Sequence, residues 1–329
     1  MSRFFNKPFW IALLTISLLA CQPLRESSTP LVTTPSPYWT ISGRKEYQVR
    51  QTLKLVNRGP GQPEKQNLWV ALIRTLPPYQ EVMSLEITPK DYALITDEYG
   101  NQYAEFDLSE HPAGTTRVVQ IDYRLVVNEL SYDLSACQGE LLEDFIRPEL
   151  HIESANPQII ALANQLSQGK LDVCQQVRAF YDYIGDELVY TYNGENWGAQ
   201  AALGPMGADC TEYASLLVAL SRAQQIPARY FEGLLVLGDE TRNLARLEHA
   251  WADVYLPGIG WASIDPTLGR SPINREIYFA HHTPQHIILT LGPAPSTLRG
   301  SSYWTHIYWP GNSTRIQVQA GQWVIKPVE

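Results

Sequence analysis

The sequence predicts an α+β fold in two parts, an all-β region followed by a region in which helices precede a sheet. Three observations support this prediction. Strand-length segments separated by turn residues fill the stretch from 38 to about 135, apolar residues recur at helical spacing between about 156 and 225, and strand-like segments return after 228. Because 329 residues exceed one ordinary domain, we expect two, over 38–148 and 149–329.

The first 21 residues are predicted to be a targeting segment. Arg3 and Lys7 make its start basic, and residues 9–20 are apolar but too few to span a bilayer comfortably. The segment ends in Leu-Leu-Ala-Cys at Cys21, which resembles the lipobox of bacterial lipoproteins. That resemblance implies acylation of Cys21 and a lipid anchor in a membrane of the cell envelope. The alternative is an ordinary secretory signal with a chance cysteine, and either interpretation predicts export.

Residues 22–37, rich in Ser, Thr and Pro, are predicted to form a flexible spacer. In the stretch 38–148, segments such as 47–55 and 117–125 have strand length and apolar alternation, and turn signals such as 57–61 separate them. Several short strands with regular turns predict a β-sandwich of immunoglobulin-like type. We interpret this domain as a packing and spacing module in preference to a substrate-presenting one.

Composition narrows the possible partners. The formal net charge is −9, with 25 Lys and Arg against 34 Asp and Glu, so the chain lacks the basic footprint of a nucleic-acid-binding protein. The sequence contains no heptad pattern, phosphate-binding glycine loop or other cofactor motif. We therefore expect no nucleic-acid partner and no cofactor.

Three helices are predicted in the second domain. Pro157 suits the first position of one helix, and a second shows apolar residues at steps of three and four after Asp172. A third begins after Asp209, which is a good N-cap, and ends near Gln225 because Pro227 follows. The first two helices are expected to pack behind the third.

Cys210 falls in the first turn of the third helix. The unpaired N–H groups and the macrodipole at a helix N-terminus stabilise negative charge, which favours the thiolate form of a cysteine there. The backbone N–H of the same residue is also a candidate oxyanion donor. This position predicts a nucleophilic cysteine.

The stretch 248–265 is predicted to fold into an antiparallel hairpin. If pairing is centred on Pro257, His249 lies directly opposite Asp265, close enough for the carboxylate to hold an imidazole N–H. A tighter loop would put Ala252 opposite Asp265, and a bulge would then be needed to restore the pair. With the pair formed, the histidine can take the proton of the cysteine thiol.

This combination of motifs resembles the transglutaminase-like superfamily, whose fold is papain-like. The motifs that carry the resemblance are Gly207-Ala208-Asp209-Cys210, Ile226-Pro227-Ala228-Arg229, His249-Ala250-Trp251, Gly260-Trp261 and Asp265-Pro266-Thr267. Looser similarity extends from about residue 150 to 292. The resemblance implies that Cys210 is the nucleophile, His249 the base and Asp265 the residue that orients the histidine.

The resemblance leaves the reaction open, because the superfamily includes cross-linking acyl transferases, peptidases, amidases and proteins that have lost activity. We expect an enzyme that attacks peptide or amide carbonyls through a thioester, with a peptide or protein of the cell envelope as substrate. Hydrolysis is favoured because water is far more concentrated than any particular amine. A transamidating enzyme and a non-catalytic binding lipoprotein are the alternatives.

Two side chains upstream of the cysteine are candidate oxyanion donors. Trp197 offers an indole N–H and Gln200 an amide N–H. In the superfamily, an indole or amide upstream of the cysteine can play this part. The alternative interpretation of Trp197 is an aromatic wall of the cleft or a core residue.

Cysteine usage fits an exported protein. Apart from Cys21 and Cys210, the chain holds Cys137 and Cys174, which could pair as a disulfide in an oxidising compartment. Two buried free thiols are the alternative, and the sequence leaves the two outcomes evenly balanced.

Three histidines lie close together in the sequence, at His281, His282 and His286. They could bind zinc, but no Cys or carboxylate lies near them, and Pro284 interrupts any helical spacing. We interpret them as loop histidines near the cleft and expect no metal.

The C-terminal part of the chain is predicted to complete the core sheet. Residues 286–291 read as a further strand of that sheet. Short strands over 303–309, 314–319 and 322–325 are expected to form hairpins that close it.

Overall fold

The computed structural model describes residues 38–192, 194, 197–238, 248–299, 301, 303–311 and 313–328. The predicted targeting segment, the spacer and the lipidation candidate Cys21 lie outside the described residues. In the part of the chain that is described, none of the helices is both long and apolar enough to span a bilayer.

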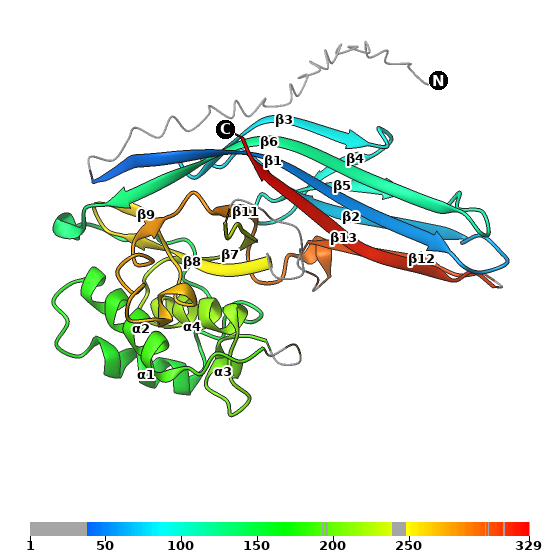
Figure 1. Cartoon of the computed structure of the whole chain (residues 1–329). Coiled ribbons are helices and arrows are strands. Elements are labelled where there is room, and N and C mark those ends of the chain that lie inside the picture. The colour runs from blue at the N-terminus through cyan, green and yellow to red at the C-terminus, as the bar shows by residue number, and fades with distance from the viewer. Residues whose placement is uncertain are drawn as a thin grey trace, which may run out of the picture. The chain divides into compact units, whose positions relative to one another are not determined.

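Two antiparallel sheets contain the strands of the N-terminal region (Figure 1). The larger sheet has the order β10-β6-β1-β13, with β3 also paired to β6. Its strands are β1 (Trp39–Asn57), β3 (Gln80–Thr88), β6 (Thr116–Tyr132), β10 (His281–His282) and β13 (Ile316–Pro327). The second sheet has the order β12-β2-β5-β4, formed by β2 (Lys65–Leu72), β4 (Ala93–Thr96), β5 (Gln102–Asp107) and β12 (Trp304–Trp309).

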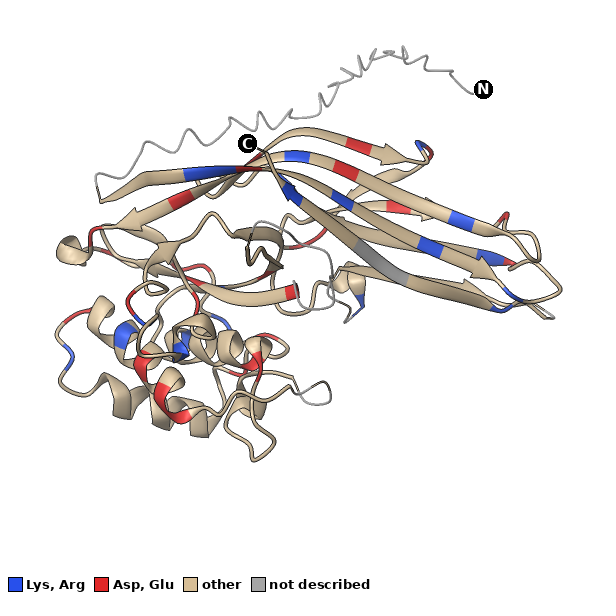
Figure 2. Ribbon diagram, viewed as in Figure 1, with Lys and Arg blue, Asp and Glu red and all other residues tan. Residues whose placement is uncertain are grey.

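The period-two pattern of β6 explains how the two sheets pack. Alternate residues of this strand are buried, namely Val119, Ile121, Tyr123, Leu125 and Val127. They share a core with Leu68 and Val70 of β2, so the two sheets form a sandwich. Charged residues of both signs lie along the strands of the larger sheet (Figure 2), and ion pairs between β1 and β6 join Arg50 to Asp122 and Arg124 to Glu46. The finer assignment to an immunoglobulin-like topology stays a prediction.

The C-terminal strands differ from their prediction, because they join the sandwich and not the core sheet. β12 pairs with β2, and β13 pairs with β1 over most of its length. Trp323 and Ile325 of β13 are buried in the sandwich core. Apolar alternation predicts that such a segment is a strand, but it carries no information on which distant strand will be its partner.

The second region is a four-stranded antiparallel sheet with helices packed on one face (Figure 1). Its order is β11-β7-β8-β9, formed by β7 (Ala228–Leu235), β8 (Glu248–Leu256), β9 (Gly260–Ile264) and β11 (His286–Leu291). The helices are α1 (Pro157–Ser167), α2 (Val173–Glu187), α3 (Ala199–Ala202) and α4 (Cys210–Ala223). Short 3-10 turns are η1 (Leu134–Ala136), η2 (Leu268–Arg270) and η3 (Ser296–Leu298). As predicted, β11 extends the core sheet.

Helix α4 is the centre of this region. Every residue from Glu212 to Arg222 is buried, because α4 packs against the other helices as well as against β7 and β8. The helix ends where Gln225 adopts a positive φ of 59°, two residues before Pro227. A helix enclosed on all sides has a fixed position, so its first residue is fixed as well.

The sandwich contacts the outer edge and face of the core sheet. Leu234 of β7 and Ile287 of β11 are buried in the sandwich core. The side chain of Gln80 donates to the carbonyl of Ile288 and accepts from its N–H, both at 2.8 Å. Asn101 bonds both backbone groups of Leu291 in the same way, again at 2.8 Å. Two amide side chains therefore bond the backbone N–H and C=O groups along the unpaired edge of β11, as a neighbouring strand would.

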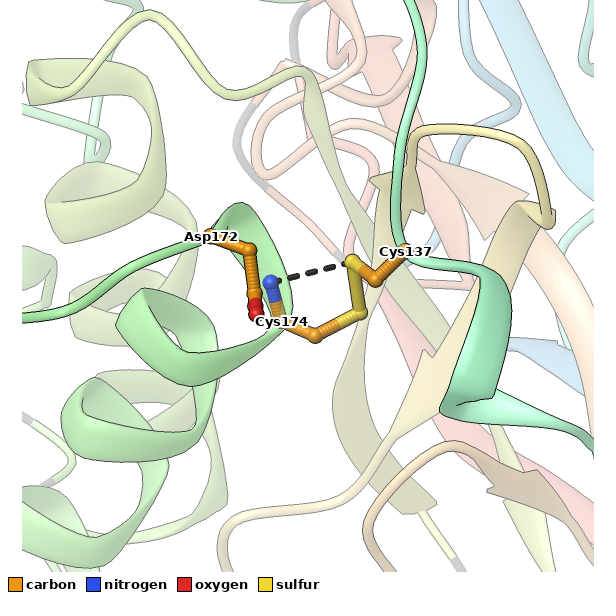
Figure 3. A group of neighbouring side chains, drawn as sticks. All are labelled: Cys137, Asp172 and Cys174. Atoms are coloured by element: carbon orange, nitrogen blue, oxygen red, sulfur yellow. Dashed lines mark hydrogen bonds between the residues drawn. A yellow bond between two sulfur atoms is a disulfide. The ribbon is translucent and has the colours of Figure 1, made fainter.

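A disulfide joins Cys137, just after η1, to Cys174 in the first turn of α2 (Figure 3). The backbone N–H of Cys174 lies 3.1 Å from the sulfur of Cys137, and Asp172 caps the helix there by accepting from Gln175. The two cysteines are 37 residues apart, a separation at which a disulfide typically stabilises a fold by about 2–4 kcal/mol. It ties the end of the sandwich to the helices of the core.

Candidate active site

Cys210 is the first residue of α4, and a capping box holds it there. Asp209 accepts from the backbone N–H of Thr211 at 3.0 Å, while Glu212 accepts from the backbone N–H of Asp209 at 2.9 Å. Burial raises the pKa of Glu212 to about 7. Cys210 is half-buried, and it is the free cysteine among the described residues.

The turn before the cysteine is also fixed. Tyr190 forms an isolated parallel bridge with Ala208, and the N–H of Thr191 donates to the carbonyl of Ala208 at 2.9 Å. Gly207 has a φ of 81°, and a Cβ there would lie 2.7 Å from the Cβ of Thr191. Only glycine fits this close approach, which explains the small residues that precede the cysteine.

His249 and Asp265 form a buried hydrogen bond, with 2.7 Å between Nε2 and Oδ2. The hairpin reaches this pairing by a register different from either one predicted. Ala252 pairs with Ile264 and Leu256 with Gly260, so the loop is tight and Asp265 follows the last paired residue. In this register His249 lies diagonally across from Asp265 on the same face of the hairpin, and diagonal neighbours are within reach of long side chains. No bulge is needed.

The carboxylate of Asp265 accepts four hydrogen bonds. Its Oδ1 accepts from the backbone N–H groups of Thr267 and Leu268, each at 2.9 Å. Its Oδ2 accepts from His249 and, at 3.1 Å, from Nε2 of His286. Burial alone would favour the neutral acid, but the two histidines outweigh it and hold the pKa of Asp265 well below its usual range. The carboxylate is therefore charged and fixed in position.

His286, the first residue of β11, was predicted as a loop histidine near the cleft, but its contact with Asp265 was not predicted. Its Nδ1 is 2.7 Å from the hydroxyl of Thr283, and burial lowers the pKa of His286, which keeps the ring neutral. In that state Nε2–H donates to Asp265 while Nδ1 accepts from the Thr283 hydroxyl. The sequence offered one signal, a polar residue at the start of a core strand after the aspartate, but not its partner.

The charge on His249 follows from the same contacts. Burial opposes its protonation, but the carboxylate of Asp265 and the hydrogen bond with Cys210 raise the pKa of His249 to about 10. Nε2 is engaged with Asp265, so Nδ1 is the nitrogen left for the sulfur. The indole of Trp251 stacks on the imidazole at a centroid distance of 5.9 Å. The arrangement favours an imidazolium beside the thiol group, as in a thiolate–imidazolium pair.

Trp197 and Gln200 make their contacts with residues other than these three. The ring of Trp197 is 5.6 Å from that of His151, and the backbone N–H of Gln200 donates to Glu153 at 3.2 Å. Both side chains line a hollow with Met206, and its walls do not include Cys210. The oxyanion role of Trp197 and Gln200 stays a prediction.

The residues present do not favour a metal ion. Ligand atoms of His249, Asp265 and His286 lie within 4.8 Å of one another, but N–H donors of both histidines already point to one carboxylate oxygen. A metal would require both nitrogens to be deprotonated and reoriented. His281 instead bonds Glu129 at 3.1 Å. The other group, Cys137, Asp172 and Cys174, has its sulfurs bound in the disulfide (Figure 3).

Comparison with known proteins identifies the region that contains these residues. Residues 160–266 match the transglutaminase-like superfamily, so this part of the chain is a transglutaminase-like core and the resemblance predicted from its motifs is confirmed. A curated relative, the uncharacterized protein YebA of Bacillus subtilis, is 27% identical over 135 residues. The match covers 36% of this chain but 18% of that protein, less than a fifth of its length.

One of the similar solved structures shares the fold. A protein from Cytophaga hutchinsonii, described as a candidate cysteine protease, has a TM-score of 0.64 and 16% sequence identity, covering 88% of this chain and 93% of its own. The periplasmic domain of TgpA from Pseudomonas aeruginosa is 17% identical over 74% of this chain and 97% of its own, with a TM-score of 0.37, which is too low to carry an argument. The likeness to the Cytophaga hutchinsonii protein shows the fold alone.

Proposed function

We propose that this protein is a thiol hydrolase that cleaves peptide or amide bonds, with Cys210 as nucleophile, His249 as proton carrier and Asp265 as the residue that orients the histidine. The observation that carries the proposal is the 2.7 Å bond between His249 and Asp265, beside a cysteine fixed at the N-terminus of a buried helix. The superfamily match over residues 160–266 supports the same class of chemistry.

The mechanism begins with the thiolate of Cys210, whose sulfur attacks the carbonyl carbon and pushes the π electrons onto the oxygen. The backbone N–H of Cys210, one of the unpaired donors at the start of α4, is placed to stabilise that oxyanion. As the intermediate collapses, the imidazolium of His249 gives its proton to the departing amine, which leaves a thioester. Neutral His249 then deprotonates water, water attacks the thioester, and expulsion of the sulfur releases the acid.

His286 and Thr283 act in this scheme as positioning residues. They do not touch the substrate, but their contacts leave Asp265 one rotamer and one charge state. The imidazole of His249 then has a fixed plane and a fixed tautomer, which is what proton transfer at the sulfur requires.

Hydrolysis is proposed over transamidation because water is far more concentrated than any particular amine. Transamidation would instead be revealed by incorporation of a labelled amine into an acceptor protein. A non-catalytic binding lipoprotein is the remaining alternative, and the hydrogen-bonded state of His249 and Asp265 argues against it.

We also propose that the protein is exported and held at a membrane of the cell envelope through acylated Cys21. The basic and apolar start of the sequence supports this, and so does the disulfide, which forms in oxidising compartments. Labelling cells with a clickable fatty acid tests it: the wild-type chain should be labelled and recovered in membranes, and Cys21→Ser should lose the label.

The rate of Cys210 alkylation by iodoacetamide against pH tests the catalytic proposal. A thiolate–imidazolium pair should react at pH values well below those at which a free thiol does, and His249→Ala should lose this advantage, with Cys210→Ala as the blank. If the wild-type protein and His249→Ala react alike, the catalytic role fails and the binding lipoprotein becomes the proposal to pursue.

A further inference from the structure

An exposed arginine, Arg270, lies beside the proposed catalytic residues and takes no part in their hydrogen bonds. It ends η2, the turn that follows Asp265 directly, and its Nη1 donates to the carbonyl of Thr267 at 2.5 Å. The central carbon of its guanidinium lies 4.5 Å from the ring centroid of Tyr190. Backbone and ring contacts therefore hold the cation in one place.

Tyr190 connects this cation to the cysteine side of the site. It is bridged to Ala208, two residues before Cys210, and its ring lies 6.1 Å from that of Tyr213, one helical turn after Cys210. Tyr190 as a whole residue is 46% exposed. Burial and then the charge of the Cys210 sulfur raise the pKa of the Tyr190 hydroxyl, which agrees with its closeness to the sulfur. Tyr190 and Arg270 thus span from the cysteine turn to the aspartate turn at the surface.

Arg270 differs from the neighbouring arginines in its partners. Arg275 contacts Asp186 at 2.8 Å, and Arg178 is paired with Asp182 and Glu276. Among the residues that the structure describes, Arg270 has no carboxylate partner, and its Nε and Nη2 donors face no protein acceptor. The nearby Asp265 is already satisfied by four donors, so it does not need the arginine.

We infer that Arg270, backed by the ring of Tyr190, binds a carboxylate carried by the acyl substrate close to the bond that is cleaved. A planar guanidinium with two adjacent free donors matches a carboxylate in the two-point manner that arginine prefers. The chain has a net charge of −9 and would otherwise repel an anionic substrate. The substrate class is therefore an acidic peptide or amide. This inference rests on the proposed function, because it concerns the substrate of the same site.

Charged and neutral thiol reagents of equal size test the inference without knowledge of the substrate. The full chain carrying Cys21→Ser, purified in mild detergent, has Cys210 as its reactive thiol. We would measure the alkylation rates of iodoacetate and iodoacetamide and take their ratio, then repeat the pair with the dianionic disulfide dithiobis-nitrobenzoate and a neutral dithiodipyridine. These larger reagents place their charge further from the sulfur.

Arg270→Gln should lower the anionic-to-neutral rate ratio by about threefold to tenfold, because one nearby cation is lost. Arg270→Lys should retain part of the ratio for iodoacetate, and added salt should reduce the wild-type ratio. Lys54→Gln, which removes one exposed positive charge from β1, is the matched control and should leave the ratio unchanged. An Arg270→Gln ratio equal to that of the wild type would overturn the inference.

A second measurement uses the protein with Arg270 intact, so it can be made even if Arg270→Gln fails to fold. N-acetylglutamate amide should protect Cys210 from iodoacetamide at concentrations at which neutral N-acetylglutamine amide does not, and equal protection by the two would contradict the inference. Failure of this inference can be distinguished from failure of the proposed catalytic function. A thiol that reacts like a free cysteine argues against catalysis, yet the ratio between reagents can still be read at alkaline pH, where every thiol reacts.

Discussion

Two buried aspartates of the same hairpin have different partners and different roles. Asp253, on β8, contacts Arg229 and accepts from the hydroxyl of Tyr79 at 2.9 Å, whereas Asp265, just after β9, contacts two histidines. Both are fully or almost fully buried. His249 and Asp253 even share one face of β8, since strand side chains alternate. The two sites therefore differ in the partners of the carboxylate and not in its burial.

The comparison teaches that the partner decides what a buried carboxylate can do. An arginine does not act as a proton carrier, so Asp253 can only stabilise structure, and burial raises the pKa of Asp253 despite the cation beside it. His249 can take up and release a proton, and the fixed charge of Asp265 stabilises its imidazolium form. The first site joins Tyr79 of the sandwich to the core sheet, and the second is suited to chemistry.

The largest expected effect comes from Asp265→Asn. The amide keeps the shape but loses the charge and presents a donor where His249 and His286 both donate, so the imidazole of His249 loses its orientation. We expect kcat/KM for peptide or amide hydrolysis to fall by about 100-fold to 1000-fold. The protein should still fold, which circular dichroism checks. A loss below tenfold would remove Asp265 from the mechanism.

Asp253→Asn is expected to lower stability and to leave activity nearly unchanged. It leaves the largely buried guanidinium of Arg229 without its countercharge, which should lower the free energy of unfolding by about 3 kcal/mol in urea titrations. Activity per folded molecule should stay near that of the wild type. Tyr79→Phe, which removes only the hydroxyl, is the matched control and should cost about 1 kcal/mol. A large loss of activity without a loss of stability would erase the distinction between the two aspartates.

A smaller effect is expected from His286→Gln, which sharpens the comparison by changing only the support of Asp265. A carboxylate held by three donors and not four should orient His249 less well, so kcat should fall by about tenfold with KM unchanged. The rate of Cys210 alkylation against pH should shift as well, a change that a purely structural role would not produce. Thr283→Val, which removes the hydroxyl behind His286, should act in the same direction but more weakly.

Local features of the site could be predicted from the sequence. Asp209 as a cap and Cys210 at a helix start depend on neighbours in the chain, and both were read correctly. The closeness of His249 to Asp265 was predicted from a register that is wrong by two residues. Because the side chains of a strand alternate with period two, this shift keeps both residues on the same face. What needed the structure is non-local: the partner of β13, and the contact of His286 with Asp265. Periodicity indicates which residues are buried, but it does not choose among distant partners.

The smallest effect concerns the pH dependence of stability. Buried and partly buried histidines contribute to it in two different pH ranges. Burial lowers the pKa values of His282 and His286 and that of His306 to about 4. The unfolded chain binds these protons near pH 6.5 and the folded chain does not, so stability should fall as the pH drops from about 6.5 towards 4.

His249 has the opposite sign, because its folded pKa is raised to about 10. Its contribution is complete below about pH 6.5 and is lost as the pH rises towards 10. Urea unfolding from pH 4 to pH 10 should therefore show a maximum near neutrality. His249→Ala should reduce the fall in the free energy of unfolding at alkaline pH and leave the acid side unchanged. His306→Gln should reduce the fall at acid pH by about 1 kcal/mol, a small amount because the His306 ring is partly exposed to solvent screening. If His249→Ala leaves the alkaline side unchanged, the histidine is not held as an imidazolium by Asp265, and the contrast between the two aspartates loses its physical basis.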